Sequence, residues 1–220
     1  MRRLPWDRRL AAVASLGDEN RRKLFGFVTS SPRPVGRDEA AAALGIPRST
    51  ASFHLDRMVQ DGVLTAEFRK LGGKAGPGSG RPAKTYRAAQ PEVGASVPDR
   101  NYDLAGELMV AAIEHSTAVG EPVRDALLAT SHAKGLAMAE GSPGLEEFLA
   151  AEGYLPVPDG DGGFALGNCP FHRLADGHAD IVCAMNGAFL SGAAAGCGVA
   201  ESRIVGNDAP GQCCARITPS

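Results

Sequence analysis

LGIPRSTASFHLDRMVQDGVL, residues 44–64, is the stretch that decides the fold of the first half of this chain. Pro47 stands near the first turn of an expected helix, and Ala51, Leu55 and Met58 or Val59 share one of its faces. The preceding residues, DEAAAALGI, predict a short helix that ends at Gly45, where the lack of a side chain suits a tight turn. Two helices joined by a short turn are typical of a helix-turn-helix, whose second helix enters the major groove of DNA. A plain helical hairpin in a core is the alternative.

The second helix predicts the residues that would meet DNA. We expect its exposed side to carry five polar residues, of which the first four would face bases: Arg48, Ser49, Thr50, Ser52 and His54. Arg57 would contact phosphate. A further helix is expected over residues 18–30, because Asp18 is a suitable N-cap and Leu24, Phe25 and Val28 fall at helical spacing.

After Gly62 the apolar period changes from helical to extended. VLTAEFRKL (63–71) and KTYRA (84–88) predict two strands joined by the Gly-rich loop GGKAGPGSGRPA (72–83). Such a hairpin beside a helix-turn-helix is a wing, and its basic residues would touch phosphates or a minor groove: Arg69, Lys70, Lys74, Arg81 and Lys84. A solvated charged linker would leave the flanking strand patterns unexplained.

The residues quoted above, followed by GRPAKTYRA (80–88), resemble the winged helix-turn-helix regulators of the ArsR and DeoR type in bacteria. The resemblance covers roughly residues 18–90. It implies a transcriptional regulator, most often a repressor, that binds a double-stranded, pseudo-palindromic DNA operator as a homodimer.

Charge and cysteine are distributed unequally along the 220 residues. Residues 1–90 hold 17 Lys and Arg against 8 Asp and Glu, whereas the remainder holds 6 against 17. A basic half with an acidic partner half fits a protein in which only one half meets phosphates. We expect no membrane segment and no secretory signal, and therefore a cytoplasmic protein in which thiols stay reduced.

The pattern predicts an α+β protein with an N-terminal winged helix-turn-helix (1–90), a linker (91–100), and a C-terminal sensor and dimerisation domain (101–220). The C-terminal domain is expected to mix helices with small β-hairpins. Helical patterns cover 101–116, 121–140, 144–154 and 176–196, and hairpins are expected around 159–163 and 208–211.

All five cysteines lie in this last domain: Cys169, Cys183, Cys197, Cys213 and Cys214. Their spacing is unlike that of zinc fingers, which bring two ligands within two to four residues of each other. Scattered thiolates in a reduced compartment fit an iron-sulfur cluster, which does not need a compact motif. Zinc at the same residues, or five cysteines acting only as small apolar core residues, are the alternatives.

GNCPFH, IVCAMN and GQCCARI resemble the cysteine segments of the SufR family of iron-sulfur-dependent repressors. The resemblance implies ligands at Cys169, at Cys183 and at Cys213 or Cys214. We favour Cys169, Cys183 and Cys213, with His172, Cys197 or Cys214 as the possible further ligand. We expect only one of Cys213 and Cys214 to face the site, because neighbours on a strand point to opposite faces. A C-terminal domain that binds a small molecule without metal is the second hypothesis. No catalytic constellation is convincing, so we expect a protein that is not an enzyme.

Overall fold

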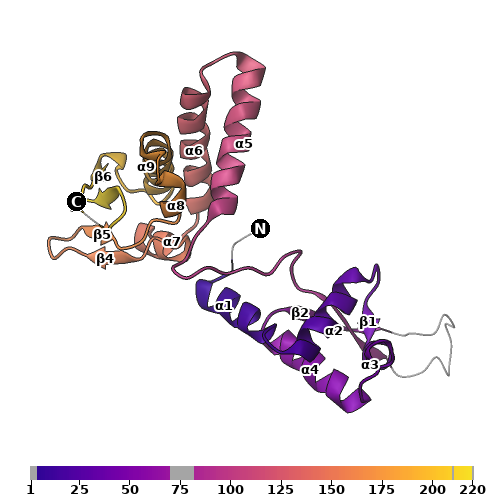
Figure 1. Cartoon of the computed structure of the whole chain (residues 1–220). Coiled ribbons are helices and arrows are strands. Elements are labelled where there is room, and N and C mark those ends of the chain that lie inside the picture. The colour runs from indigo at the N-terminus through magenta and orange to yellow at the C-terminus, as the bar shows by residue number, and fades with distance from the viewer. Residues whose placement is uncertain (1–3, 70–81, 210, 220) are drawn as a thin grey trace. The chain divides into compact units, whose positions relative to one another are not determined.

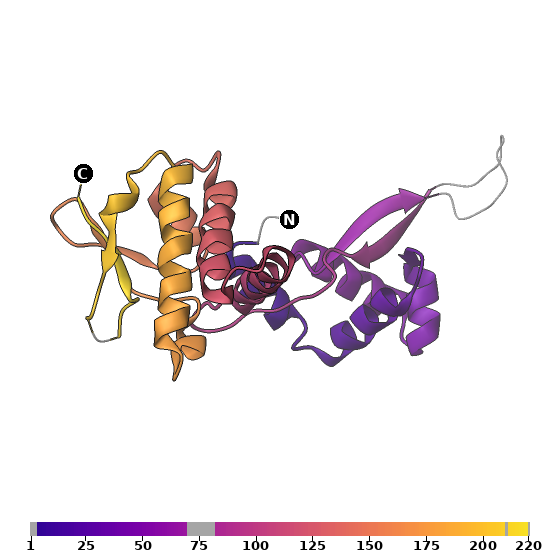
Figure 2. The same cartoon turned by 90° about the horizontal axis from the view of Figure 1, so that it is seen from above.

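The computed structural model describes residues 4–69, 82–209 and 211–219. It divides into two compact units, Leu4–Ala95 and Ser96–Ser220, with the boundary inside the segment 91–100 (Figures 1 and 2). Each unit is described by itself below. In the described part of the chain, no helix is both long and apolar enough to cross a membrane.

The N-terminal unit is a winged helix-turn-helix in its described residues. Its elements follow in the order α1 (Trp6–Ser15), α2 (Glu19–Ser30), β1 (Val35–Gly36), α3 (Arg37–Leu44), α4 (Arg48–Gln60), β2 (Leu64–Arg69) and β3 (Ala83–Ala88). The strands form an antiparallel sheet in the order β1-β3-β2. The expected helices and both wing strands are confirmed, whereas α1 and the two-residue β1 have no counterpart in the sequence prediction.

The turn between α3 and α4 depends on one glycine. Gly45 has a φ of 64°, a left-handed conformation that costs glycine little. The N–H of Ile46 then reaches the carbonyl oxygen of Ala41 at 3.1 Å and that of Gly45 reaches Ala42 at 3.3 Å, which satisfies the last carbonyls of α3. At the start of α2, the Asp18 carboxylate accepts the N–H of Arg21 at 2.9 Å, as expected of an N-cap.

Small and branched apolar side chains hold α4 against the rest of this unit. The faces of α2 and α4 that the sequence predicts to be apolar are buried, and Tyr86 of β3 lies fully inside. The buried cluster consists of Ala12, Leu24, Val28, Val35, Ala40, Ala41, Ala51, Leu55, Met58, Val63, Leu64 and Tyr86. Burial of one face of α4 fixes which of its residues point outward.

The C-terminal unit combines helices with a small sheet, as predicted. Its helices are α5 (Tyr102–Val119), α6 (Val123–Ala139), α7 (Leu145–Ala151), α8 (His172–Ala175) and α9 (Ala179–Gly196), with a 3₁₀ turn at Glu201–Arg203. Its strands are β4 (Pro156–Pro158), β5 (Phe164–Leu166), β6 (Ile204–Gly206) and β7 (Ala215–Ile217), in the antiparallel order β4-β5-β7-β6. Both expected hairpins are present, as β4 with β5 and as β6 with β7.

Helices α6 and α9 lie side by side with their backbones in direct contact (Figures 1 and 2). A Cβ added at Gly192 of α9 would lie 2.0 Å from the carbonyl oxygen of His132. A Cβ added at Gly135 of α6 would lie 2.1 Å from that of Phe189. Because no side chain larger than hydrogen fits at either position, glycine is what permits this close packing.

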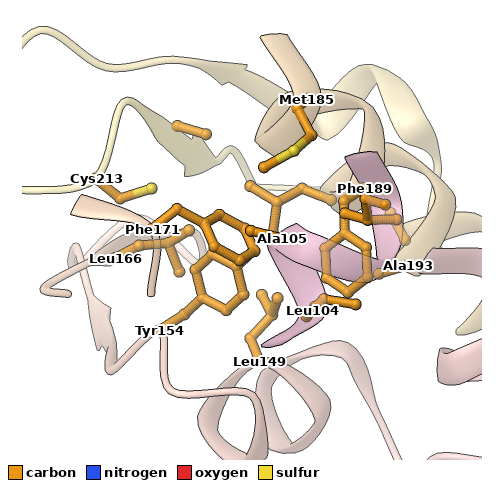
Figure 3. Close-up of a cluster of buried hydrophobic side chains, with 14 of the residues drawn as sticks. Leu104, Ala105, Leu149, Tyr154, Leu166, Phe171, Met185, Phe189, Ala193 and Cys213 are labelled. Atoms are coloured by element: carbon orange, nitrogen blue, oxygen red, sulfur yellow. The ribbon is translucent and has the colours of Figure 1, made fainter. Parts of the chain in front are cut away.

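The core of this unit gathers around aromatic side chains from several segments (Figure 3). Tyr154 and Phe171 meet edge to face with ring centroids 6.5 Å apart, and Phe189 packs against Phe148 at 6.2 Å. Cys213 is fully buried beside this group. Cys213 therefore belongs to the core of this unit and does not lie in a peripheral loop.

Candidate functional site

The outward face of α4 is the first candidate site. Arg48, Ser49, Phe53 and Arg57 are exposed, whereas Thr50 and Ser52 are half-buried. Since Ala51, Leu55 and Met58 are buried on the opposite side, this face cannot rotate inward without exposing the core. Of the predicted base contacts, Arg48 and Ser49 therefore lie exposed at the start of this face, as a base-reading helix requires, with Thr50 and Ser52 half-buried beside them.

Two predicted DNA contacts are engaged in surface ion pairs. Arg48 pairs with Asp38 of α3, and both side chains are largely exposed. Arg57 pairs with Asp61 at 3.2 Å, one helical turn further on. Exposed pairs of this kind contribute about 0–1 kcal/mol, so a phosphate or base can compete for either arginine.

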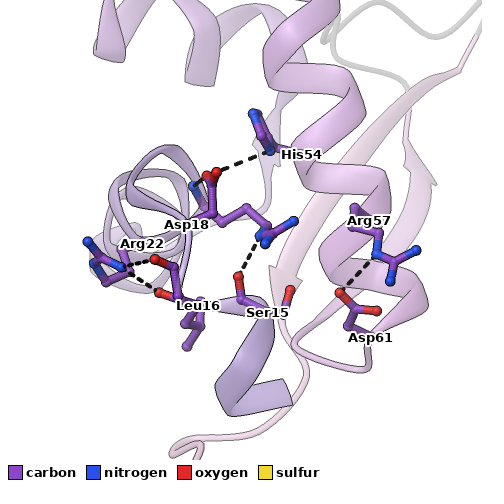
Figure 4. A network of polar contacts seen from close by, with 9 residues as sticks. Ser15, Leu16, Asp18, Arg22, His54, Arg57 and Asp61 are labelled. Atoms are coloured by element: carbon purple, nitrogen blue, oxygen red, sulfur yellow. Dashed lines mark hydrogen bonds and ion pairs between the residues drawn. The ribbon is translucent and has the colours of Figure 1, made fainter. Parts of the chain in front are cut away.

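The expected exposed position of His54 is wrong. Its side chain is only 12 % exposed, and its Nδ1 lies 3.9 Å from the carboxylate of Asp18 at the start of α2 (Figure 4). His54 lies between the exposed Phe53 and the buried Leu55 in α4. Its side chain points toward α2 and away from the outer face. The same region holds Arg22, which donates to the carbonyl oxygens of Leu16 at 2.9 Å and of Gly17 at 2.6 Å.

Lys84, predicted to contact phosphate, instead joins the wing to α4. Its Nζ lies 2.6 Å from the carboxylate of Asp56, which also accepts the hydroxyl of Tyr86 at 2.7 Å. Burial disfavours the charged carboxylate, but these two hydrogen bonds outweigh that effect and hold the pKa of Asp56 below its usual range. Burial and the Asp56 charge together raise the pKa of Tyr86 above its ordinary value.

The remaining wing residues are only partly described. Arg69 lies at the end of β2, half-exposed, and pairs with Glu67 at 2.9 Å. Lys70, Lys74 and Arg81 lie outside the described residues.

Two side chains on this surface have no counterpart in the sequence prediction. Phe53 is 66 % exposed in the middle of the outer face of α4, one turn after Ser49. Arg37, at the start of α3, places its guanidinium 3.5 Å from the Ser52 hydroxyl. The period of α4 already puts residue 53 opposite Ala51 and Leu55, so Phe53 could have been found from that pattern.

Comparison with known proteins bears on this region alone. Residues 16–67 match a family model described as a helix-turn-helix domain. The matched segment begins before α2 and ends within β2, so it contains the turn and the whole of α4. It supports a DNA-binding transcriptional regulator. The description names neither the ArsR nor the DeoR type, and that finer resemblance stays a prediction. No curated protein and no solved structure matches the chain.

The second candidate site is a cluster of four thiols in the C-terminal unit. Cys169 precedes α8, Cys183 lies in α9, and Cys213 and Cys214 precede β7. Their side chains interact in sequence, Cys169 with Cys213, Cys213 with Cys214, and Cys214 with Cys183. Three segments that are distant in the sequence thus bring together the three predicted ligands and Cys214.

The side chain of Asn186 connects the paired cysteines. Its amide nitrogen lies 3.3 Å from Sγ of Cys213 and 3.7 Å from Sγ of Cys214, while its oxygen accepts the hydroxyl of Tyr154 at 2.6 Å. The expectation that only one of the two neighbouring cysteines faces this site is wrong, because both precede β7 and do not follow strand alternation.

The four thiols differ in acidity. A hydrogen bond from Cys213 holds the pKa of Cys169 below its ordinary value in spite of burial, and the backbone N–H of Phe171 adds to this effect. The same contact raises the pKa of Cys213 to about 12. Burial, together with the contact to Cys214, raises the pKa of Cys183 to about 12. Cys169 is therefore the thiol of this cluster whose pKa its contacts lower.

The other two candidate ligands are placed differently. Sγ of Cys197 contacts the carbonyl oxygen of Ala139 at 3.9 Å, at the end of α6, and His172 is exposed on α8. Of the alternatives for a further ligand, Cys214 is the one in contact with the predicted trio. Within residues 4–69, 82–209 and 211–219, no three His, Cys, Asp or Glu side chains are grouped so that they could hold a metal ion. The four thiols interact as a chain and do not converge on one point.

Proposed function

We propose that this protein is a sequence-specific transcriptional regulator that binds a pseudo-palindromic DNA operator as a homodimer. The observation that carries the proposal is the outer face of α4, where Arg48, Ser49 and Phe53 lie exposed beside an antiparallel wing. A helix held this way can enter the major groove while the wing contacts the backbone. The match of residues 16–67 to a helix-turn-helix domain supports it.

Selection of bound sequences from random duplex DNA, followed by binding measurements on the selected site, tests this proposal. We expect Arg48→Ala to lose about 10- to 100-fold in affinity and to relax the preference at one base pair, because a bidentate base contact contributes ~1–3 kcal/mol. Arg173→Ala removes an exposed cation from α8 and serves as the matched control, which should leave binding unchanged. A wild-type protein that selects no sequence would refute the proposal.

We further propose that an iron-sulfur cluster is held by Cys169, Cys183, Cys213 and Cys214 and sets the affinity for DNA. Four thiols of the right kind are drawn together from three segments, all five cysteines are free, and Asn186 can donate to sulfur. Ligation requires the sulfurs to converge from their present chain of contacts. A bound cluster would supply a redox-sensitive centre, and zinc is the alternative metal for the same thiolates.

Anaerobic purification with iron, sulfide and zinc analysis separates these alternatives. We expect a visible absorption band with iron and sulfide present, lost in Cys214→Ser and retained in the matched variant Cys197→Ser. Colourless protein that contains zinc would show that these thiolates bind zinc and not an iron-sulfur cluster. Colourless, metal-free, folded protein would instead favour the hypothesis of a small-molecule-binding C-terminal domain.

A further inference from the structure

The last residues of the expected linker are bonded to the segment that carries Cys169. The N–H of Asn101 donates to the carbonyl oxygen of Pro170 at 3.1 Å, and the guanidinium of Arg100 donates to the carbonyl oxygen of Cys169 at 3.2 Å. The same guanidinium donates to the side-chain oxygen of Asn168. Asn101 is also the N-cap of α5. The start of α5 is therefore tied to a segment that lies 69 positions further along the chain.

The side chain of Asn168 adds the second half of this contact. Its amide nitrogen donates to the carbonyl oxygen of Asp99 at 2.8 Å and to that of Gly153 at 2.6 Å. Asp99 is buried, and its carboxylate would lie 2.9 Å from a Cβ added at Gly153. We call residues 99–101 and 168–170, held together by these hydrogen bonds, the clasp. Every residue of 168–170 bonds to the end of the linker.

The side chain of Cys169 contacts the thiol cluster. Its thiol is in contact with that of Cys213, which is fully buried in the core (Figure 3). Cys213 is held from two sides, because its N–H donates to the carbonyl oxygen of Leu166 at 2.9 Å and its sulfur accepts the amide of Asn186 at 3.3 Å. Cys169 is only half-buried and lies outside the helices and strands. Its backbone thus belongs to the clasp while its sulfur touches a fixed partner.

We propose that Cys169 and Cys213 form a disulfide when the metal-free protein meets hydrogen peroxide, and that the clasp carries this change to the start of α5. The Cys169 sulfur attacks one peroxide oxygen, the O–O bond breaks, and a sulfenic acid and one water form. The Cys213 sulfur then attacks the sulfenic sulfur, the S–O bond breaks, and a second water leaves. The two thiols lose two electrons and two protons, and the peroxide gains both.

The disulfide would loosen the clasp. A covalent bond brings two sulfurs closer together than a contact between two thiols does. Because the core holds Cys213, Cys169 moves, and its carbonyl oxygen is drawn away from Arg100. The adjacent Asn168 and Pro170 are displaced with it, so the hydrogen bonds to residues 99–101 weaken. The proposal rests on the proposed function only for its last step, a changed affinity for DNA.

Peptide mapping tests the disulfide. The full chain, freed of metal with a chelator, is treated with one equivalent of hydrogen peroxide, alkylated and digested with trypsin without reduction. Cleavage after Lys and Arg gives the peptides 135–173 with Cys169, 174–203 with Cys183 and Cys197, and 204–216 with Cys213 and Cys214. We expect 135–173 to be linked to 204–216.

Single variants identify the partner within the third peptide. The link should persist in Cys214→Ser and in the matched control Cys197→Ser, and it should be lost in Cys213→Ser. A main product that links 174–203 to 204–216, or no link between peptides in the wild type, would overturn the proposed disulfide.

Hydrogen exchange tests the clasp. The N–H of Asn101 is bonded to Pro170, and the N–H of Arg100 is bonded to the Ser96 hydroxyl at 2.8 Å, so both report on this segment. We expect oxidation to speed the exchange of residues 96–104 by about 3- to 10-fold, as the loss of one hydrogen bond allows. Unchanged exchange in protein that carries the disulfide would overturn the clasp.

Variants of Asn168 separate positioning from a purely structural role. Asn168→Ala should exchange rapidly at residues 96–104 before oxidation, and oxidation should add nothing although the disulfide still forms. Asn168→Asp keeps an acceptor for Arg100 but loses both donors, so its response should be intermediate. A response to oxidation equal to that of wild type in either variant would overturn the positioning role of Asn168.

Binding to the selected operator distinguishes these failures from failure of the proposed function. We expect oxidised and reduced wild type to differ in affinity by at least about 5-fold, and Asn168→Ala to show a smaller difference. Equal affinities of oxidised and reduced wild type would overturn the effect on DNA and leave the regulator intact. A wild type that selects no DNA sequence would reject the regulator, while hydrogen exchange would still decide the clasp.

Discussion

Lys84 of β3 holds the carboxylate of Asp56 of α4 at 2.6 Å, and this pair joins the base of the wing to the recognition helix. The two residues are 28 positions apart, and Tyr86 donates to the same carboxylate from the same strand. The wing is therefore held against α4 by a partly exposed contact between two distant segments. No short motif in the sequence reveals this contact.

Acidification should weaken this contact. The pKa of Asp56 is lowered in the folded chain, so its contribution to stability is present above the unfolded pKa of about 4 and is lost as the pH falls through the lower, folded value. Because the Asp56 side chain is about 41 % exposed, we expect only about 0.5–1 kcal/mol. Thermal unfolding between about pH 5 and 3 should show a smaller loss of stability in Asp56→Asn than in wild type. If the stability of wild type and of Asp56→Asn falls equally with pH, Asp56 does not make this contribution.

The close packing of α6 and α9 predicts a sharp contrast between two glycines of one helix. Gly192→Ala should destabilise the protein by about 1–3 kcal/mol, because the new methyl group would collide with the carbonyl of His132. Gly187→Ala should be neutral or stabilise by up to about 1 kcal/mol, since nothing lies within 4 Å of its added Cβ. Chemical denaturation measures both, and equal effects would show that α6 and α9 can separate freely.

Phe53 should contribute to DNA affinity without contributing to stability. The side chain is 66 % exposed on the outer face of α4, where an apolar group can contact a thymine methyl in the major groove. We expect Phe53→Ala to weaken binding to the selected site by about 10-fold with an unchanged melting temperature. Replacing thymine by uracil in the site should weaken wild type more than Phe53→Ala. If the wild type binds the thymine and uracil sites with equal affinity, Phe53 does not contact this methyl group.

The reduced, metal-free thiols should react in a defined order. Cys169 has a lowered pKa and Cys183 and Cys197 have raised ones, so alkylation at about pH 7–8 should modify Cys169 first. Peptide mass spectrometry after a short exposure to iodoacetamide measures this order. Cys213→Ser should change the pH at which Cys169 reacts, because Cys213 makes the largest contribution to its shift. Cys197→Ser should not, and simultaneous modification of all five cysteines would be evidence against the described contacts.

Most helices with an apolar period were predicted from the sequence, whereas α1 and the short strand β1 were not. The pattern of Ala51, Leu55 and Met58 located α4 and its buried face, and Gly45 located the turn. Strand β1 contains only two residues and owes its pairing to β3. Helix α1 buries few of its residues and was not predicted, although Trp6, Leu10 and Val13 fall at helical spacing.

The candidate sites were predictable as segments but not as contacts. The resemblance to the SufR family grouped Cys169, Cys183 and Cys213. Only the fold shows that Cys214 contacts Cys183 while Cys197 turns toward Ala139. His54 was placed on the wrong side although the period of Ala51, Leu55 and Met58 puts residue 54 beside the buried face of α4. Its contact with Asp18, 36 positions earlier in the chain, is what no local pattern reveals.

The contact between Gly192 and His132 also has a mechanical consequence. Helix α9 supplies Cys183 and Asn186 to the thiols at one end and touches α6 backbone to backbone further along. Side chains usually absorb small displacements by changing rotamer, but none stands between these two backbones. Since α6 in turn packs against α5, a movement of α9 would be transmitted through α6 to α5. Stiffness, more than proximity, is what would connect thiol chemistry to α5.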